Sequence, residues 1–290
     1  MSNIYVYQHF GLGDFISCNG LIRSLLNQVK DNGNLHIFVP ASYKDTISFM
    51  YRDEPKIKII TIDVGKKVHR IAGRRTEKIV KKEVKKTFNE VNKYFQSISD
   101  KNYKYIRIGF DYYWPTYYLN PDKNAPWTCD MIFYKQMNIP YESRYTKCYW
   151  QRNMTEEERA FNELVQDKSK PFAFVHDEPQ RGFIIEKENI SSNLQIIRNS
   201  PNENLFNFGL ILERASEIHV MESSFRNMLE TLDTSNAKHY FYKFSHVPWG
   251  VLPYYHKEKN IYIGTSKSWV FRDLKEIKIK RNWFSRIFKF

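Results

Sequence analysis

The first 110 residues alternate between short, nearly continuous apolar runs and longer segments in which apolar residues recur every three or four positions. The apolar runs are rich in β-branched and aromatic residues and predict strands at residues 3–9, 35–39, 57–62 and 103–110. The three- and four-residue spacing predicts helices at residues 15–29, 43–51 and 75–98. Such an alternation of strands and helices is typical of a parallel sheet covered by helices on both faces.

The second half of the chain repeats this rhythm after a charged segment at residues 151–169. Its pattern predicts a helix, a strand, two short strands and a final helix–strand–helix–strand series, at residues 155–165, 171–175, 182–199 and 205–244. The 290 residues are enough for two small domains, and a hydrophobic content of 42% is enough for a sizeable core. We predict a first α/β domain at residues 1–150, a second at residues 151–274, and a basic, aromatic tail at residues 275–290.

Cysteine usage and the lack of long apolar segments predict a cytoplasmic protein. Cys18, Cys129 and Cys148 are few and widely spaced, which favours neither a disulfide framework nor a zinc site and fits a reducing compartment. No run reaches the roughly 18 apolar residues of a membrane-spanning helix. The first ten residues lack the basic and apolar regions of a secretory signal and are expected to form a strand instead.

The net charge of +13 is concentrated in two segments. Residues 66–86 hold ten Lys or Arg against two Glu, and residues 272–290 hold seven against two acids, so these segments carry the whole excess. The first segment is either a solvated helix face or a surface that attracts an anionic acceptor or a membrane. The tail alternates Lys and Arg with Ile, Trp and Phe. It either lies peripherally on the inner membrane surface or docks back across both domains.

A glycine-rich turn, Gly11-Leu12-Gly13-Asp14, follows the first predicted strand. In open α/β sheets, ligands bind outside the carboxyl ends of the strands, and glycines let the backbone approach a ligand closely. The turn lacks the third glycine of a dinucleotide-binding fingerprint, because Ile16 occupies that position, and it lacks the Gly-Lys of a P-loop. Asp14 either faces a ligand or caps the following helix, and the pattern leaves both interpretations open.

Two polar turns in the second half are candidates for phosphate binding. His176 and Arg181 follow the strand predicted at residues 171–175, and guanidinium groups bind phosphate well. Glu222, Ser223 and Ser224 precede a predicted helix, whose first N–H groups favour an anion. A solvated loop and simple helix capping by serine are the structural alternatives. No cluster of His and Cys supports a metal site, so none is predicted.

An aromatic run after the fourth strand contains Tyr112, Tyr113 and Trp114. Flat rings that carry hydroxyl or indole donors suit stacking against a sugar, although packing of a long loop explains them equally well. Because the run should lie at the same sheet edge as Asp14, we predict it on the acceptor side of the site, with Asp130 as a further candidate.

The segment YQHFGLGDFISCNGLIRSLL resembles the N-terminus of heptosyltransferase-type glycosyltransferases of the GT-B fold. The resemblance implies two Rossmann-like domains facing a cleft, with Asp14 as the base that deprotonates the acceptor hydroxyl and with Gly11 and Gly13 on the acceptor side. It also implies that Glu222, Ser223, Ser224, His176 and Arg181 contact the donor. The chain departs from the family pattern after Glu222, since Ser223-Ser224-Phe225 replaces an Asp-Ser/Thr-Gly turn and no His follows on the helix.

The function implied by this resemblance is hexosyl or heptosyl transfer. A nucleotide-sugar would be the donor and a glycan or glycolipid hydroxyl the acceptor, with inversion at C1 and with neither metal nor cofactor. A nucleic-acid-binding protein and a non-catalytic sugar-binding scaffold are the alternatives. Nucleic acid is the weaker partner prediction, because the basic segments and the aromatic run lie apart in the sequence.

Overall fold

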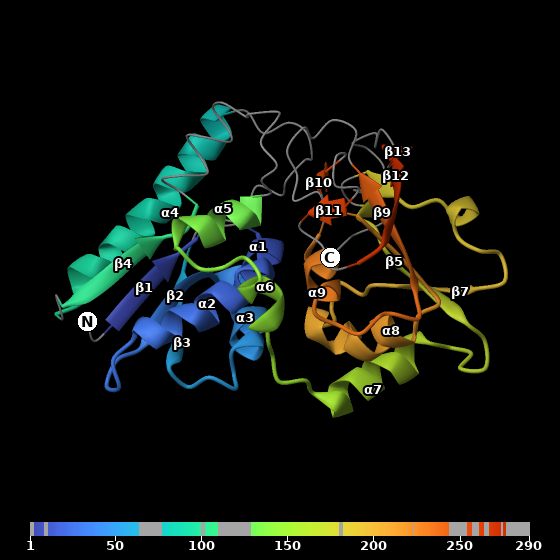
Figure 1. Cartoon of the computed structure of the whole chain (residues 1–290), viewed down its shortest axis with the longest axis horizontal. Helices are drawn as coiled ribbons and strands as arrows, with labels where there is room; N and C mark the ends of the chain where they lie inside the picture. Colours follow the sequence, from blue (N-terminus) through green and yellow to red (C-terminus); the bar gives the residue numbers. More distant parts are fainter. Residues whose placement is uncertain are drawn as a thin grey trace, which may run out of the picture.

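Two parallel sheets form the frame of the computed structural model, one in each half of the chain (Figure 1). The structure describes residues 3–8, 11–63, 77–99, 102–109, 129–179, 182–221, 223–243, 254–256, 261–263, 267–273 and 275–276. The sheets lie side by side, with α1 and α9 packed against each other between them (Figure 1). Among the described residues, no helix combines the length and apolar character needed to span a membrane.

The first sheet has the strand order β3-β2-β1-β4, and all of its described pairs are parallel. Its strands are β1 (Asn3–Tyr7), β2 (Leu35–Pro40), β3 (Ile57–Ile62) and β4 (Tyr103–Arg107). Alternate side chains of β1 point to opposite faces. Ile4 and Val6 join the main core, whereas Tyr5 and Tyr7 pack in a second cluster that includes Val91 of α4 (Glu77–Ser97). The predicted strand and helix order of this half is confirmed.

The helices of the first half differ from the prediction at one point. The helix predicted at residues 15–29 is two helices, α1 (Leu12–Ser17) and α2 (Asn19–Leu25), which meet in a turn at Cys18. Gly20 lets α6 (Ser143–Thr146) approach, because a Cβ atom there would lie 2.0 Å from the carbonyl oxygen of Ser143. The remaining described helical segments of this half are α3 (Lys44–Met50), α5 (Cys129–Gln136), and the 3₁₀ turns η1 (Leu26–Gln28) and η2 (Ala41–Tyr43).

The second sheet has the order β12-β9-β8-β5-β7, again with parallel neighbours. Its strands are β5 (Phe172–His176), β7 (Gln195–Arg198), β8 (Glu217–Met221), β9 (Lys238–Lys243) and β12 (Trp269–Asp273). The sequence pattern did not predict β12. The described helical segments are α7 (Met154–Leu164), α8 (Gly209–Arg214), α9 (Ser224–Leu229), and the 3₁₀ turns η5 (Lys187–Asn189) and η6 (Leu205–Phe208).

Short strands near the C-terminus were also not predicted. β10 (Tyr254–His256) pairs with β11 (Ile261–Ile263), and β13 (Lys275–Glu276) pairs with β6 (Phe183–Ile184). The first two residues of the predicted tail therefore lie against the second half, while residues 277–290 lie outside the described residues. Of the predicted basic segment, residues 66–76 lie outside the described part, and residues 77–86 begin α4.

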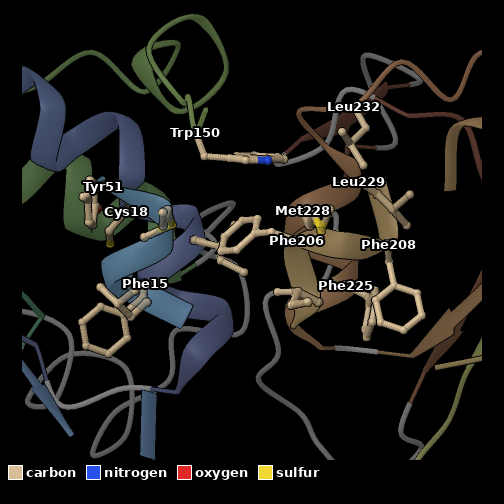
Figure 2. Close-up of a cluster of buried hydrophobic side chains, with 14 of the residues drawn as sticks. Phe15, Cys18, Tyr51, Trp150, Phe206, Phe208, Phe225, Met228, Leu229 and Leu232 are labelled. Carbon is tan, nitrogen blue, oxygen red and sulfur yellow. The ribbon is translucent and has the colours of Figure 1, made fainter. Parts of the chain in front are cut away.

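One hydrophobic core runs through both halves. It joins Phe15 of α1 and Cys18, in the turn after it, to Phe225 and Met228 of α9, and Figure 2 shows Trp150 and Phe206 between the two groups of helices. The Phe206 ring stacks on Phe49 of α3 with ring centroids 5.5 Å apart, and its centroid lies 5.0 Å from that of Trp150. Aromatic rings bury large areas and dominate such contacts, so this cluster holds the halves together.

Two buried histidines of the second sheet make stability depend on pH. Burial lowers the pKa of His219, although Glu217 opposes the shift, and burial together with Lys267 lowers the pKa of His239 to about 4. In the unfolded chain both would titrate near 6.5. Below that pH the unfolded state binds protons that the folded state does not. Stability is therefore expected to fall as the pH drops below about 6.5. For His239 the loss continues to about pH 4, by at most about 1.4 kcal/mol per pH unit.

Urea unfolding at pH 7.5, 6.0 and 5.0 measures this dependence. His239→Gln should flatten it, because glutamine does not titrate and its amide can still bond the hydroxyl of Thr234, which lies 2.8 Å from His239 Nε2. A variant with the same pH dependence as the native chain would show that His239 does not contribute.

Candidate functional site

The Gly11–Asp14 segment is the first turn of α1, at the carboxyl end of β1. Gly11 is the N-cap residue, and Asp14 lies three residues further on, inside the helix. The Asp14 carboxylate reaches back and accepts a hydrogen bond from the Gly11 N–H through Oδ2, at 2.9 Å. Asp14 therefore caps the helix, from the third helical position and not from the N-cap. A carboxylate has several acceptor sites, so this hydrogen bond is compatible with a second role.

Gly13 brings the two predicted halves of the site together. A Cβ atom added to it would lie 2.8 Å from Asn227 Nδ2, 3.5 Å from the backbone nitrogen of Ser224 and 3.6 Å from the carbonyl carbon of Ser223. The absence of a side chain at this position thus lets the turn after β1 touch the start of α9. Two motifs that were predicted independently, from distant parts of the sequence, meet at this contact.

The start of α9 does not use Ser223 as a simple cap. Ser223 occupies the N-cap position, but its side chain makes no capping hydrogen bond. Its Oγ atom is buried and has no hydrogen-bond partner among the described residues. Helix capping was the alternative interpretation of this serine in the sequence, and the Ser223 side chain does not perform it. α9 has only six residues, so its dipole is small. Any anion bound at its start would be held mainly by hydroxyl and backbone N–H groups.

His176 ends β5 next to the same helix. Its ring centroid lies 4.6 Å from that of Phe225, which follows Ser224 in α9, and its Nδ1 lies 2.9 Å from Oδ1 of Asn199. An amide oxygen only accepts, so Nδ1 donates in this contact, and Nε2 is the acceptor in the tautomer that results. The neighbouring Asp177 is anchored instead by an ion pair with Arg198 and by the N–H of Ile185.

Five of the predicted site residues lie outside the described residues. They are Arg181 and Glu222 on the donor side, and Tyr112, Tyr113 and Trp114 on the acceptor side. Their roles remain predictions. The described members of the predicted site, Gly11, Gly13, Asp14, His176, Ser223 and Ser224, gather around α1, the start of α9 and the end of β5.

A buried polar network connects the halves beside this contact, and the sequence did not predict it. Arg144 of α6 is 2% exposed and forms an ion pair with Asp130 of α5, which is fully buried. Arg144 Nη2 also donates to Oδ1 of Asn227 across the contact, at 2.9 Å, and Nη1 donates to the Tyr141 hydroxyl, at 2.7 Å. Asp130 is therefore engaged with Arg144 and Tyr141 inside the protein, and its acceptor-side role stays a prediction.

The network continues along α9. Oδ1 of Asn227 also accepts a hydrogen bond from Nη1 of Arg226, at 3.0 Å, and Nη2 of Arg226 lies 3.5 Å from a carboxylate oxygen of Glu230. Polar residues within an apolar helix were the only sequence signal for this arrangement. Their connection to Arg144 depends on how the halves pack, which the local pattern does not encode.

The electrostatics of this region keep Cys18 a neutral thiol. Burial raises the pKa of Cys18, and the negative charges of Asp14 and Asp130 raise it further, while Arg144 partly opposes them. A thiolate nucleophile is therefore disfavoured here. The carboxylate of Asp14 remains the candidate base.

Comparison with solved structures supports the fold of this arrangement. The structure of a glycosyl transferase family 9 protein from Veillonella parvula is similar to 94% of this chain and 87% of its own chain, with 9% identity and a TM-score of 0.52. The structure of ADP-heptose LPS heptosyltransferase II from E. coli is similar to 96% of this chain and 91% of its own, with 13% identity and a TM-score of 0.50. No protein-family model and no curated protein matches the sequence. The likeness confirms the predicted fold class, two Rossmann-like domains of the GT-B type, and the predicted resemblance to heptosyltransferases at the level of the fold.

Proposed function

We propose that this protein is a glycosyltransferase that moves a sugar from a nucleotide-sugar to a hydroxyl group of a glycan or glycolipid. One observation carries the proposal most directly: the contact between the Gly11–Asp14 turn and the start of α9. The contact joins the segment that carries the Asp14 carboxylate to the segment that carries the Ser223 hydroxyl, which has no hydrogen-bond partner among the described residues. The fold in which this occurs resembles those of two proteins named as glycosyltransferases.

In this proposal the second half binds the donor. The hydroxyl groups of Ser223 and Ser224 and the backbone N–H groups at the start of α9 would donate hydrogen bonds to the diphosphate. His176 would accept a hydrogen bond from a donor hydroxyl through Nε2, and Arg181 and Glu222 would complete the pocket. The acceptor would bind on the side of Gly11 and Gly13, with Tyr112, Tyr113 and Trp114 stacking on its sugar rings.

The proposed reaction is a direct displacement. The acceptor oxygen forms a bond to C1 of the donor sugar while the bond from C1 to the diphosphate oxygen breaks, so the configuration at C1 inverts. Asp14 takes the proton of the acceptor hydroxyl as that bond forms. The nucleoside diphosphate leaves with the electron pair, and its charge is stabilised by the donors at α9 and by Arg181. Neither a metal nor a cofactor takes part in this scheme.

A thermal-shift screen against nucleoside diphosphates and nucleotide-sugars tests the proposal. A ligand at about 100 times its Kd stabilises the folded state by about 2.7 kcal/mol. Ser223→Ala should weaken the stabilisation by the ligand without destabilising the protein, since it removes a buried hydroxyl that lacks a partner. Ser97→Ala, at an exposed position on α4, is the matched control.

Failure of every nucleotide to stabilise the chain would contradict the proposal. Salt-dependent binding of RNA without any nucleotide effect would favour a nucleic-acid-binding protein. Stabilisation by a nucleotide-sugar without transfer to any acceptor would favour a non-catalytic sugar-binding scaffold.

A further inference from the structure

Gln8 carries an unsatisfied carboxamide at the carboxyl end of β1. The residue is 1% exposed, and neither Nε2 nor Oε1 has a hydrogen-bond partner in the part of the chain that the structure describes. Among the buried side chains of the described residues, it is the only one with two such atoms. Burying an amide without partners opposes folding, so an unsatisfied group of this kind needs an explanation.

The position of Gln8 connects it to the proposed site. At the end of β1, the carbonyl of Tyr7 accepts a hydrogen bond from the N–H of Ile108, which follows β4, at 2.9 Å. Gln8 is the next residue after Tyr7. Gln8 therefore lies just beyond the end of the strand, where ligands bind in open parallel sheets, three residues before Gly11. The alternation along β1 places Gln8 on the same side as Ile4 and Val6, which belong to the core that reaches α9.

A second glutamine at the same edge of the sheet shows what a structural role looks like. Gln136 of α5 donates through Nε2 to the carbonyl of Arg107, at 2.8 Å, and accepts through Oε1 from the N–H of Gly109, at 2.7 Å. It thereby ties α5 to the end of β4, with both ends of the amide satisfied. Gln8 makes no comparable pair of hydrogen bonds with the described residues.

We propose that Gln8 binds the acceptor, and that its carboxamide forms hydrogen bonds with hydroxyl groups of a sugar. A carboxamide presents a donor and an acceptor side by side, which matches two adjacent hydroxyls. It carries no charge, so it suits a neutral polyol better than a phosphate or carboxylate, for which arginine is the usual partner. This inference rests on the proposed function, to which it adds a residue and a ligand class. Because Gln8 is covered, the sugar reaches it only after a neighbouring part of the chain moves.

The test separates binding from stability through two matched substitutions. Gln8→Met keeps the length of the side chain and removes two unsatisfied polar atoms, so its urea midpoint should equal or exceed that of the native chain. Its affinity for the sugar should fall about ten-fold or more, because two hydrogen bonds are lost. Gln136→Met should behave in the opposite way, with a lower urea midpoint and unchanged sugar affinity.

Sugar binding is measured by saturation-transfer NMR on the full chain. The probes are glucose, galactose, mannose, N-acetylglucosamine, fucose and a heptose. Each sugar is added together with the nucleoside diphosphate that gives the largest thermal shift. If no nucleoside diphosphate gives a shift, each sugar is added alone. The expected result is a signal from at least one sugar that weakens in Gln8→Met and not in Gln136→Met.

Three outcomes would overturn the inference: no signal from any sugar with the native chain, equal signals from the native chain and Gln8→Met, or a Gln8→Met variant that is destabilised or unfolded. The last would mean that the carboxamide is satisfied inside the protein. Nucleotide stabilisation without a Gln8 effect would leave the proposed function intact and reject only this inference. A sugar signal that depends on Gln8, without stabilisation by any nucleotide, would support this inference and contradict the proposal that the donor is a nucleotide-sugar.

Discussion

Replacing Asp14 with Asn is expected to slow sugar transfer by a factor of about 10²–10⁴, the usual contribution of a positioned base. The side-chain oxygen of Asn can still accept the hydrogen bond from the Gly11 N–H, so the start of α1 should stay intact. What Asn cannot do is take a proton from the acceptor hydroxyl. Initial rates of donor consumption at saturating donor, together with the urea midpoint, measure the two effects separately.

Asp14→Ala is the comparison that distinguishes capping from catalysis. It removes both the base and the cap, so it should be as slow as Asp14→Asn and also less stable, by about 0.5–2 kcal/mol. If Asp14→Asn kept full activity and Asp14→Ala lost only stability, Asp14 would be a helix cap and the base would have to be another residue.

Removing the guanidinium of Arg144 is expected to cost about 3–5 kcal/mol of folding free energy, because Arg144→Leu leaves Asp130 buried without its charge partner. The substitution also removes the hydrogen bond to Asn227 that crosses between the halves. Urea unfolding of the native chain and of the variant measures the loss. The double variant Arg144→Leu with Asp130→Leu should recover part of it, since replacing a buried ion pair with apolar side chains is often neutral.

Arg159 is the control for this prediction. It forms ion pairs with Glu156, Glu163 and Glu203, but it lies on the surface. Exposed ion pairs contribute little, so Arg159→Leu should change stability far less than Arg144→Leu. Equal losses from the two variants would mean that the burial of the Arg144–Asp130 pair is not what makes it important.

Local patterns in the sequence predicted most of the two sheets, because strands such as β1, β2 and β8 are short apolar runs, each followed by a helix. β12 and β13 escaped prediction for a physical reason. β12 begins with only three consecutive apolar residues, Trp269 to Phe271, before the charged Arg272 and Asp273. β13 has only two residues and pairs with β6, far away in the sequence, so little in the local pattern distinguishes either strand from a loop. The break at Cys18 escaped for the same reason, since it accompanies the approach of α6 to Gly20, a tertiary contact.

The sequence predicted the individual segments of the candidate site but not the contacts between them. The sequence pointed to Asp14 and Ser223 separately, and only the structure shows that Gly13 brings their segments into contact. Arg144 had no signal at all, because its partners come from α5 and α9. For Gln8, the sequence shows a polar residue after an apolar strand, whereas the lack of hydrogen bonds is visible only in three dimensions.

The hydrophobic core that runs through Trp150 and Phe206 has a consequence for how this molecule unfolds. Each half supplies part of the apolar surface that the other buries, so separating them would expose aromatic rings such as Phe49 and Phe206 to water. Loss of either half should therefore destabilise the other. The chain is expected to melt in a single cooperative transition, and a fragment cut near residue 170 should aggregate instead of folding alone.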